Sequence, residues 1–276
     1  VEEASLAAAD TITTRSFYDA LVRASTKGVS AGLGAIGSMK ATVKAGLRSA
    51  GDPDGSNFLG INGIDSIDSG VFISGKSSFI SRRTNIVSEM RSDLVSITTV
   101  GGGGGFAGVG AESFVDDNTT SAVRIEDGTI VTSDTVNISA LAERAVDGFA
   151  DAQAYAVAAG SGATLEINAL GDALGDFHDN DDGAAKTQIT GKNIQIDSLN
   201  KTYKELILSN DLATVAGFTK NVTTGAGSAL GLAILGTKTE LGTATNLAQS
   251  NVNLGDAVIT GRGSFADSSS VIVRAL

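Results

Sequence analysis

Short runs in which aliphatic residues alternate with polar ones recur along this chain. In one run, Val136 and Ile138 alternate with Asn137 and Ser139. Successive side chains of a strand point to opposite faces, so this two-residue period is typical of strands with one buried face. The buried positions are aliphatic and mostly β-branched, which favours stacked parallel strands. The same alternation occurs at Val95 and Ile97, at Leu206 and Leu208, and at Val271 and Val273.

An imperfect internal repeat contains a short strand, a polar turn with glycine and a second strand. Four copies are aligned through one isoleucine each: Ile73, Ile125, Ile189 and Ile259. The interval from one isoleucine to the next lengthens along the chain. At roughly 20 residues per coil, each repeat would form about three coils of a β-solenoid. The unequal intervals predict that loops of different length leave some corners.

Three tracts of small residues separate the repeats, at 101–111, 156–164 and 225–236. Aliphatic residues recur in and beside them, so we expect a thin face where glycine and alanine let opposing sheets pack closely, in preference to a flexible linker. The five consecutive glycines at Gly101–Gly105 are the best candidate for a hinge.

The N-terminal segment, 1–65, differs from the rest. Phe17, Leu21 and Val22 recur at helical spacing within 16–24, which predicts a short capping helix. Such a helix would cover the open strand edges of a solenoid end. The alternative is an extended arm that docks on a neighbouring subunit. We therefore divide the chain into an N-terminal cap or assembly segment, 1–65, and β-solenoid repeats, 66–276.

Composition narrows the classes of partner. The chain has 276 residues, no cysteine and a formal net charge of −11. The absence of cysteine excludes disulfides and thiolate metal sites, and the negative charge argues against nucleic acid, whose binding needs a basic face. The most apolar run, 226–236, is about half the length that crosses a bilayer, so we expect no membrane insertion.

One acidic cluster is the candidate metal site. Carboxylate oxygens at this density suit Ca²⁺, although the spacing matches neither an EF-hand loop nor the glycine-rich nonapeptide calcium repeat. The alternative is a solvated acidic loop that leaves a corner of the solenoid. The candidate calcium ligands are Asp172, Asp176, Asp179, Asp181 and Asp182.

Catalytic chemistry has little support in this sequence. His178 is the only histidine, and no Gly-x-Ser-x-Gly motif accompanies it. Parallel β-helices do host polysaccharide lyases and hydrolases, but the three tyrosines Tyr18, Tyr155 and Tyr203 are scattered and do not predict a sugar-binding groove. We expect that the protein is not an enzyme, and we assign no catalytic or cofactor-binding residue.

A glycine- and alanine-rich strand at 106–111 is followed by an acidic Asn/Thr segment at 115–120 and a strand pair at 123–130. In this order the sequence resembles the giant bacterial surface exoproteins with β-strand repeats, which include filamentous-haemagglutinin-like adhesins and leukotoxin-type repeat proteins. The resemblance covers residues 106–170, and weaker similarity extends towards the C-terminus. It implies a right-handed parallel β-helix, secretion, and a role in adhesion or as a scaffold.

Together these patterns predict an all-β protein, a right-handed parallel β-helix or β-solenoid. The expected function is that of a secreted structural or adhesive module in a bacterial surface fibre, adhesin stalk or surface layer. Its partners would be further copies of itself, joined head to tail, or other surface proteins. The alternatives are a glycan-binding adhesin domain and a β-helix polysaccharide lyase or hydrolase.

Overall fold

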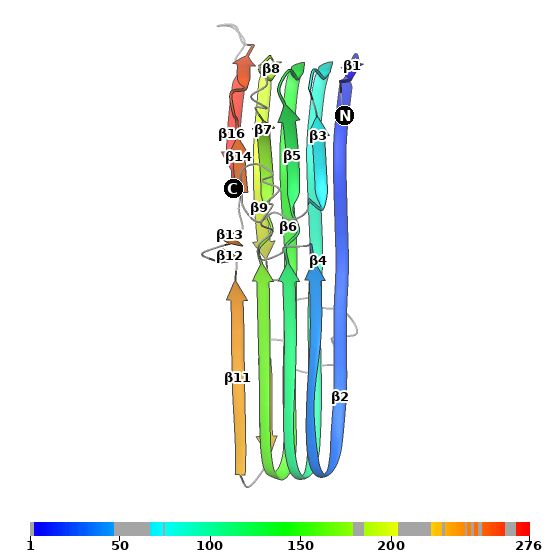
Figure 1. Cartoon of the computed structure of the whole chain (residues 1–276), viewed down its shortest axis with the longest axis vertical. Coiled ribbons are helices and arrows are strands. Elements are labelled where there is room, and N and C mark those ends of the chain that lie inside the picture. The colour runs from blue at the N-terminus through cyan, green and yellow to red at the C-terminus, as the bar shows by residue number, and fades with distance from the viewer. Residues whose placement is uncertain are drawn as a thin grey trace.

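Figure 1 shows the computed structural model, in which long strands lie side by side along one axis. The structure describes residues 3–46, 67–73, 75–178, 185–203, 222–227, 230–240, 242–243, 246–247, 250–262 and 269–276. The strands are β1 (Ser5–Ala7), β2 (Thr11–Ala45), β3 (Ser69–Ile73), β4 (Ser78–Asp117), β5 (Ser121–Glu126), β6 (Ile130–Ala169), β7 (Ala173–His178), β8 (Gln188–Gly191), β9 (Asn193–Tyr203), β10 (Val222–Gly227), β11 (Leu230–Glu240), β12 (Gly242–Thr243), β13 (Asn246–Leu247), β14 (Ser250–Asn253), β15 (Val258–Gly261) and β16 (Ser270–Ala275).

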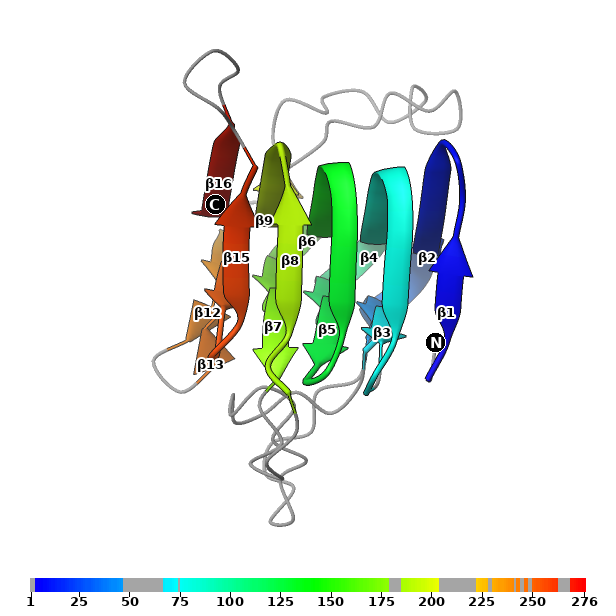
Figure 2. The same cartoon turned by 90° about the horizontal axis from the view of Figure 1, so that it is seen from above.

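The chain repeats one path in successive layers. Ser81 pairs with Ser133, 52 residues later, and β3 pairs with β5 at the same offset, so two layers stack along their whole length. The pairing is parallel in every case except the short β12–β13 ladder. We number the layers 1 to 5 along the chain, and Figure 2 shows them side by side. Their described residues lie within 3–46, 67–117, 118–169, 170–240 and 250–276.

Later layers keep the same path but contain insertions. Ser121 pairs with Ala173 at the offset of the preceding layers. The offset is longer where Ile130 pairs with Gln188, and longer again where β6 pairs with β10 and β11. The unequal intervals thus reflect insertions, but the inserted residues fall within 179–184 and 204–221, outside the described part of the chain, so the loops at the corners stay a prediction.

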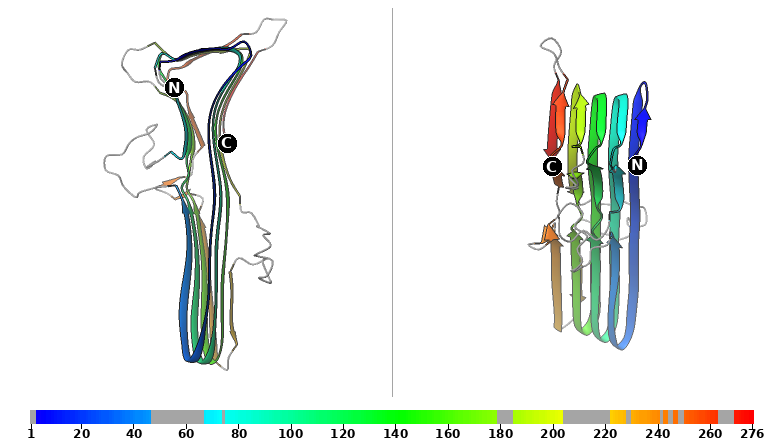
Figure 3. Two further views of the ribbon diagram at one scale, coloured as in Figure 1. Left: turned by 90° about the vertical axis from the view of Figure 1, so that its right-hand side faces the viewer. Right: turned by 45° about the horizontal axis from the view of Figure 1, so that its top comes forward.

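Each full layer has two parts, a triangular head and a long two-sided stem, which Figure 3 shows in its left panel. The head contains β1, β3, β5, β7, β8, β9 and β14–β16, with the first residues of β2, β4 and β6. The stem contains the rest of β2, β4 and β6, together with β10 and β11. In β2, β4 and β6 the chain runs down the stem, turns at its tip and returns.

Two kinds of core follow from the sequence. The head encloses ladders of aliphatic and aromatic residues, such as Phe79, Val131 and Ile189, which occupy equivalent positions in three layers. The stem is filled towards its tip mainly by alanine and valine. A Cβ atom on Gly102 would lie 2.5 Å from Val109 across the stem, so the two walls approach closely because glycine lines one of them. The thin-face interpretation of the small-residue tracts is confirmed.

The predicted repeat was partly wrong in register. Ile73 pairs with Ile125, and Ile189 pairs with Ile259, as aligned. Ile125 pairs with Phe177, however, and Ile189 pairs with Val131. The glycine turns that follow Ile73 and Ile125 lie at the corner before β4 and β6. The turns that follow Ile189 and Ile259 lie at the next corner of the path, at the ends of β8 and β15. Each repeat forms one layer and not the three coils that we expected. The two long walls of the stem contain the segments that had been assigned to the other coils.

Two local predictions were wrong. Residues 16–24, predicted as a helix, belong to β2. Phe17 points outward and stacks with Arg15 and Arg91, with 5.1 and 5.9 Å between each guanidinium carbon and the ring centre, so pairing with β4 overrides the helical spacing. Gly101–Gly104, part of the expected hinge, are paired on both sides by β2 and β6. No helix long and apolar enough to cross a bilayer occurs in the described part of the chain.

Candidate functional site

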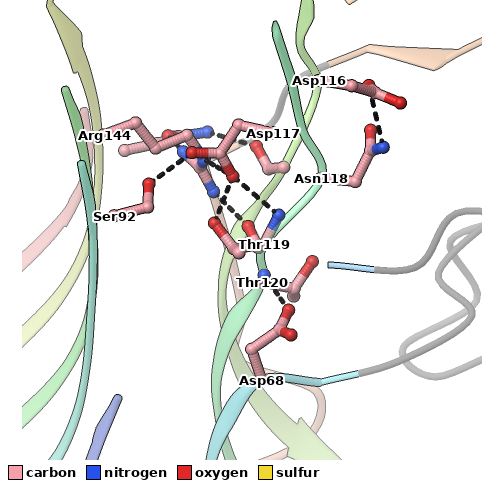
Figure 4. Close-up of polar contacts among 10 residues, drawn as sticks. Asp68, Ser92, Asp116, Asp117, Asn118, Thr119, Thr120 and Arg144 are labelled. Carbon is pink, nitrogen blue, oxygen red and sulfur yellow. Dashed lines mark hydrogen bonds and ion pairs between the residues drawn. The ribbon is translucent and has the colours of Figure 1, made fainter. Parts of the chain in front are cut away.

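A buried ion pair lies where the head meets the stem. Arg144 Nε in β6 is 3.6 Å from Asp117 Oδ1 at the end of β4, and both side chains have zero exposed area (Figure 4). Ser92 donates a hydrogen bond to the other oxygen of Asp117. Ser92 is also the register partner of Arg144 in layer 2, and Ala20 is its counterpart in layer 1. Small residues at this level leave room for one large guanidinium.

The guanidinium of Arg144 joins three layers. It donates hydrogen bonds to the carbonyl of Thr119 and to Oδ1 of Asn200 in layer 4. Asn200 in turn donates through Nδ2 to the carbonyl of Gly171, at 3.0 Å. A Cβ atom on Gly171 would lie 1.9 Å from the Thr119 oxygen and 2.4 Å from Arg144 Nη2. This position therefore requires glycine, since any side chain would displace the network.

Carboxylates fix the short step by which the chain moves from layer 2 to layer 3. Asp117 Oδ1 accepts hydrogen bonds from the backbone N–H and the hydroxyl of Thr119, at 3.0 and 2.5 Å. Asp68 Oδ2 accepts the backbone N–H of Thr120 at 2.9 Å, and Asn118 Nδ2 donates to Asp116 at 3.0 Å. The bond from the Thr119 N–H to Asp117 is that of an Asx turn, in which a side-chain oxygen accepts the backbone N–H two residues further on.

Burial changes the acidity of this cluster. It raises the pKa of Asp68 above its ordinary value, an effect that the hydrogen bond from Thr120 opposes. Burial likewise raises the pKa of Asp116, while the nearby ammonium of Lys44 acts in the opposite direction. The result is a group of acidic side chains whose ionisation is coupled to the packing of the layers.

Serine side chains near the ion pair form hydrogen bonds between the two walls of the head. Ser88 Oγ donates to the carbonyl of Ser69 at 2.9 Å and lies 2.9 Å from Oγ of Ser121 in the next layer. Further on, Ser198 donates to the carbonyl of Ala173, and Ser250 donates to the carbonyl of Ser198, both at 2.6 Å. These bonds run between layers as well as across the interior, so they fix both the width of the head and its register.

The predicted calcium ligands separate into two groups. Asp172 is buried, and its carbonyl accepts the backbone N–H of Ser121 at 3.0 Å. Asp176 is also buried, and Asn253 donates a hydrogen bond to it at 2.9 Å. Asp179, Asp181 and Asp182 lie outside the described residues.

The surroundings of Asp176 fit a calcium ion poorly. Its Oδ2 lies 4.0 Å from Arg124 Nε and 3.6 Å from His178 Nδ1, so two basic side chains occupy the position of a cation. Burial raises the pKa of Asp176, and the hydrogen bond from Asn253 opposes the shift. Among the described residues no three acidic or histidine side chains form a group that could hold a metal ion. A calcium site that includes Asp179, Asp181 and Asp182 stays a prediction.

Arg144 and Asp117 were not singled out from the sequence, although a signal was present. Ala140, Ala142, Arg144 and Val146 share one face of a strand by their two-residue period, and an arginine in that series needs a buried partner. The partner belongs to the preceding layer, at the end of a different strand, so only the layer register brings the two together.

Two open edges are the other notable feature. In the described part of the chain, β1 and β2 pair with β4 alone, and β14, β15 and β16 each pair with one strand of layer 4. The outer edge of β2 thus presents unpaired backbone groups over a strand of 35 residues. The buried network, out of contact with water, can hold layers in register, and the edges can accept more strands.

Comparison with protein-family models, curated proteins and solved structures finds no match to this chain.

Proposed function

We propose that this chain is a β-solenoid stacking module, a structural or adhesive unit of a secreted bacterial surface fibre, adhesin stalk or surface layer. The observation that carries the proposal is the residue-for-residue parallel pairing of layers 2 and 3. The proposal includes a right-handed, closed path for each layer, as the rule for parallel crossovers suggests. A stack of this kind resists bending because every layer is bonded to its neighbours along its whole length.

The open edges support growth of the stack. An unpaired strand edge binds another strand through backbone hydrogen bonds, and the edge of β2 is unusually long. Further layers of the same path, contributed head to tail by another copy, would satisfy these groups. The terminal layers of the chain therefore act as the joining surfaces, and the inner layers act as the rigid body.

Charge pairs between layers indicate how a new layer would be selected. Four basic residues of β2 face acidic residues of β4: Arg15 lies beside Glu89, Arg23 beside Asp93, Lys40 beside Glu112 and Lys44 beside Asp116. A layer added to the free side of β2 would meet the same basic residues. Two copies that joined through their β2 edges would place like charges together, which disfavours this arrangement and favours head-to-tail stacking.

Hydrogen exchange tests the proposal. At low concentration, amides of β2 that point away from β4 should exchange quickly, and they should become protected as concentration rises and filaments appear by negative-stain microscopy. The amides of β6 serve as an internal control, because β6 is paired on both sides and should be protected throughout. A particle that stays monomeric, with an edge of β2 that exchanges quickly at every concentration, would contradict the proposal.

A further inference from the structure

The tip of the stem exposes large apolar side chains. Leu33 is 90% exposed, Ile36 89%, Val29 81% and Phe106 67%. The cross-stem contacts of Gly28 with Met39 and of Gly102 with Val109 would place the turns of β2 and β4 between these positions. The long strands turn at the lower end of Figure 1. Other exposed apolar residues of the tip are Tyr155, Val157, Leu230, Leu232 and Ile234. Among the described residues outside the tip, the most exposed large aliphatic side chain is Leu276, at 67%.

Charged residues stop at one level of the stem. On the descending wall, the last charged positions are Lys27 in layer 1 and Asp151 in layer 3, which occupy the same register level. On the returning wall they are Lys40 and Glu112, which are register partners. Beyond this level there is no charged side chain in four layers, at 28–39, 100–111, 152–163, 224–227 and 230–235. We call these segments the stem tip.

The apolar surface surrounds the stem tip. Val29 and Tyr155 lie on the descending wall, whereas Phe106 and Ile36 lie on the returning wall. On the returning wall, glycines form the floor of an open groove of about 420 Å³ between the side chains of Ile36 and Ile234. The floor is made by Gly108, Gly110, Gly160 and Gly162. Ile36 belongs to layer 1 and Ile234 to layer 4, so the groove spans roughly 14 Å at about 4.8 Å per layer, which is room for an aliphatic chain.

We infer that the stem tip inserts into the outer part of a lipid bilayer. A second copy would cover one wall, whereas an apolar phase with a flat boundary explains why both walls and the turn lack charge below one level. About six residues separate that level from the turn, so the charge-free part is ~20 Å long at roughly 3.3 Å per residue. This length matches one leaflet with its headgroups, at about half of 40–45 Å.

One feature limits the depth of insertion. The outer layers of the stem tip have unpaired backbone edges, which are costly in hydrocarbon, so a single molecule would reach the interfacial region and no further. Stacking of additional layers would cover these edges. The expectation that the chain does not enter membranes considered only single apolar runs, whereas the stem tip gathers its apolar surface from separate segments of the sequence.

A single tryptophan tests this inference, because the chain has none. Phe106→Trp places the probe on the stem tip, and Phe72→Trp is the control on the head, where Phe72 is also exposed. With phosphatidylcholine vesicles, the stem-tip probe should shift to the blue and be quenched by brominated acyl chains, and the head probe should show neither effect. A stem-tip probe that is unchanged by vesicles would overturn the inference. So would a blue shift that grows with protein concentration without lipid, which would identify the stem tip as a contact between copies.

A charged variant supplies the second measurement. Leu33→Asp with Ile36→Asp should weaken vesicle flotation at least about tenfold, a change of about 1.4 kcal/mol, since each substitution replaces a buried aliphatic side chain with a charge. The matched control, Phe72→Asp with Ile80→Asp, puts the same charges on exposed apolar positions of the head and should leave flotation unchanged. Equal loss in both variants would contradict the inference. Filament formation is measured separately, so failure of either proposal can be recognised on its own.

Discussion

Arg144 Nε lies 3.6 Å from Oδ1 of Asp117, and neither side chain is exposed to solvent. A buried ion pair is expensive to desolvate, and its net contribution to stability is commonly small. Here it has a specific position, because Asp117 ends the stem of layer 2 while Arg144 belongs to layer 3. The pair also reaches Asn200 in layer 4. A shift of one layer by two residues, which keeps the same side chains facing inward, would bury each charge without its partner, so we expect the pair to specify register.

Removal of the arginine should be strongly destabilising. Arg144→Met leaves Asp117 buried and without its cation, and loss of one partner of a buried pair typically costs about 3–5 kcal/mol. The double variant Arg144→Met with Asp117→Asn should recover most of this loss, since asparagine is neutral and still accepts the N–H of Thr119. Urea unfolding followed by circular dichroism measures both free energies.

The matched control for this experiment is Arg91→Met. Arg91 lies 3.5 Å from Glu143 in the next layer, but its side chain is half exposed, and exposed pairs contribute at most about 1 kcal/mol. If Arg144→Met and Arg91→Met lower stability equally, the buried pair has no special role.

Asp68 should make the protein less stable as pH rises. Burial raises its pKa in the folded state above the ordinary aspartate value of 3.8, so the folded state holds the proton to higher pH than the unfolded state. Stability then falls as pH rises from 3.8 through the raised pKa. Asp68→Asn removes this titration, so its stability relative to the natural protein should improve over that range. Urea midpoints between pH 3 and pH 7 (roughly the range in which aspartates titrate) measure the difference.

Asp197 provides a comparison of opposite sign. Hydrogen bonds from Arg274 lower the pKa of Asp197, so its contribution to stability is present above 3.8 and is lost as pH falls through the lowered pKa. Asp197→Asn should therefore be weaker than the natural protein at neutral pH and approach it in acid. The same pH trend in both variants would show that these carboxylates do not titrate as described.

Two glycines of the stem tip should respond differently to one added methyl group. Gly104 has φ of +151°, and its Cβ would lie 1.6 Å from the carbonyl oxygen of Gly32. A Cβ atom on Gly160 would have no neighbouring atom within 4 Å. Gly104→Ala should cost about 1–3 kcal/mol through overpacking, whereas Gly160→Ala should be neutral or stabilising by up to about 1 kcal/mol. Urea midpoints and hydrogen exchange at 101–108 report the outcome, and equal effects would contradict the close packing of layers 1 and 2.

The sequence was sufficient for the all-β class, the parallel strands and the close packing at the small-residue tracts. These features depend on the local period of two and on side-chain size, which are visible in any short window. Insertions between later layers could also be inferred, since they change the spacing of otherwise similar segments.

Register and layer width could not be inferred in the same way. The turn at Gly128 and the turn at Gly191 have similar residues but lie at different corners, so alignment of Ile125 with Ile189 was wrong. The stem was missed because its turn consists of glycine, alanine and larger apolar residues, without proline or a run of polar residues. The partnership of Asp117 with Arg144 depends on this register, which is a property of the stacked layers and not of either segment.

The most direct test of the stacked layers uses the absence of cysteine from the chain. Asn85 pairs with Asn137, and strands in a sheet are about 4.8 Å apart, which is within the range of a disulfide. Asn85→Cys with Asn137→Cys should therefore cross-link readily within one chain under mild oxidation. Asn85→Cys with Ser133→Cys, which is out of register, is the control and should stay reduced. Cross-linking of the control pair with no cross-link between positions 85 and 137 would contradict the layer repeat that pairs β4 with β6.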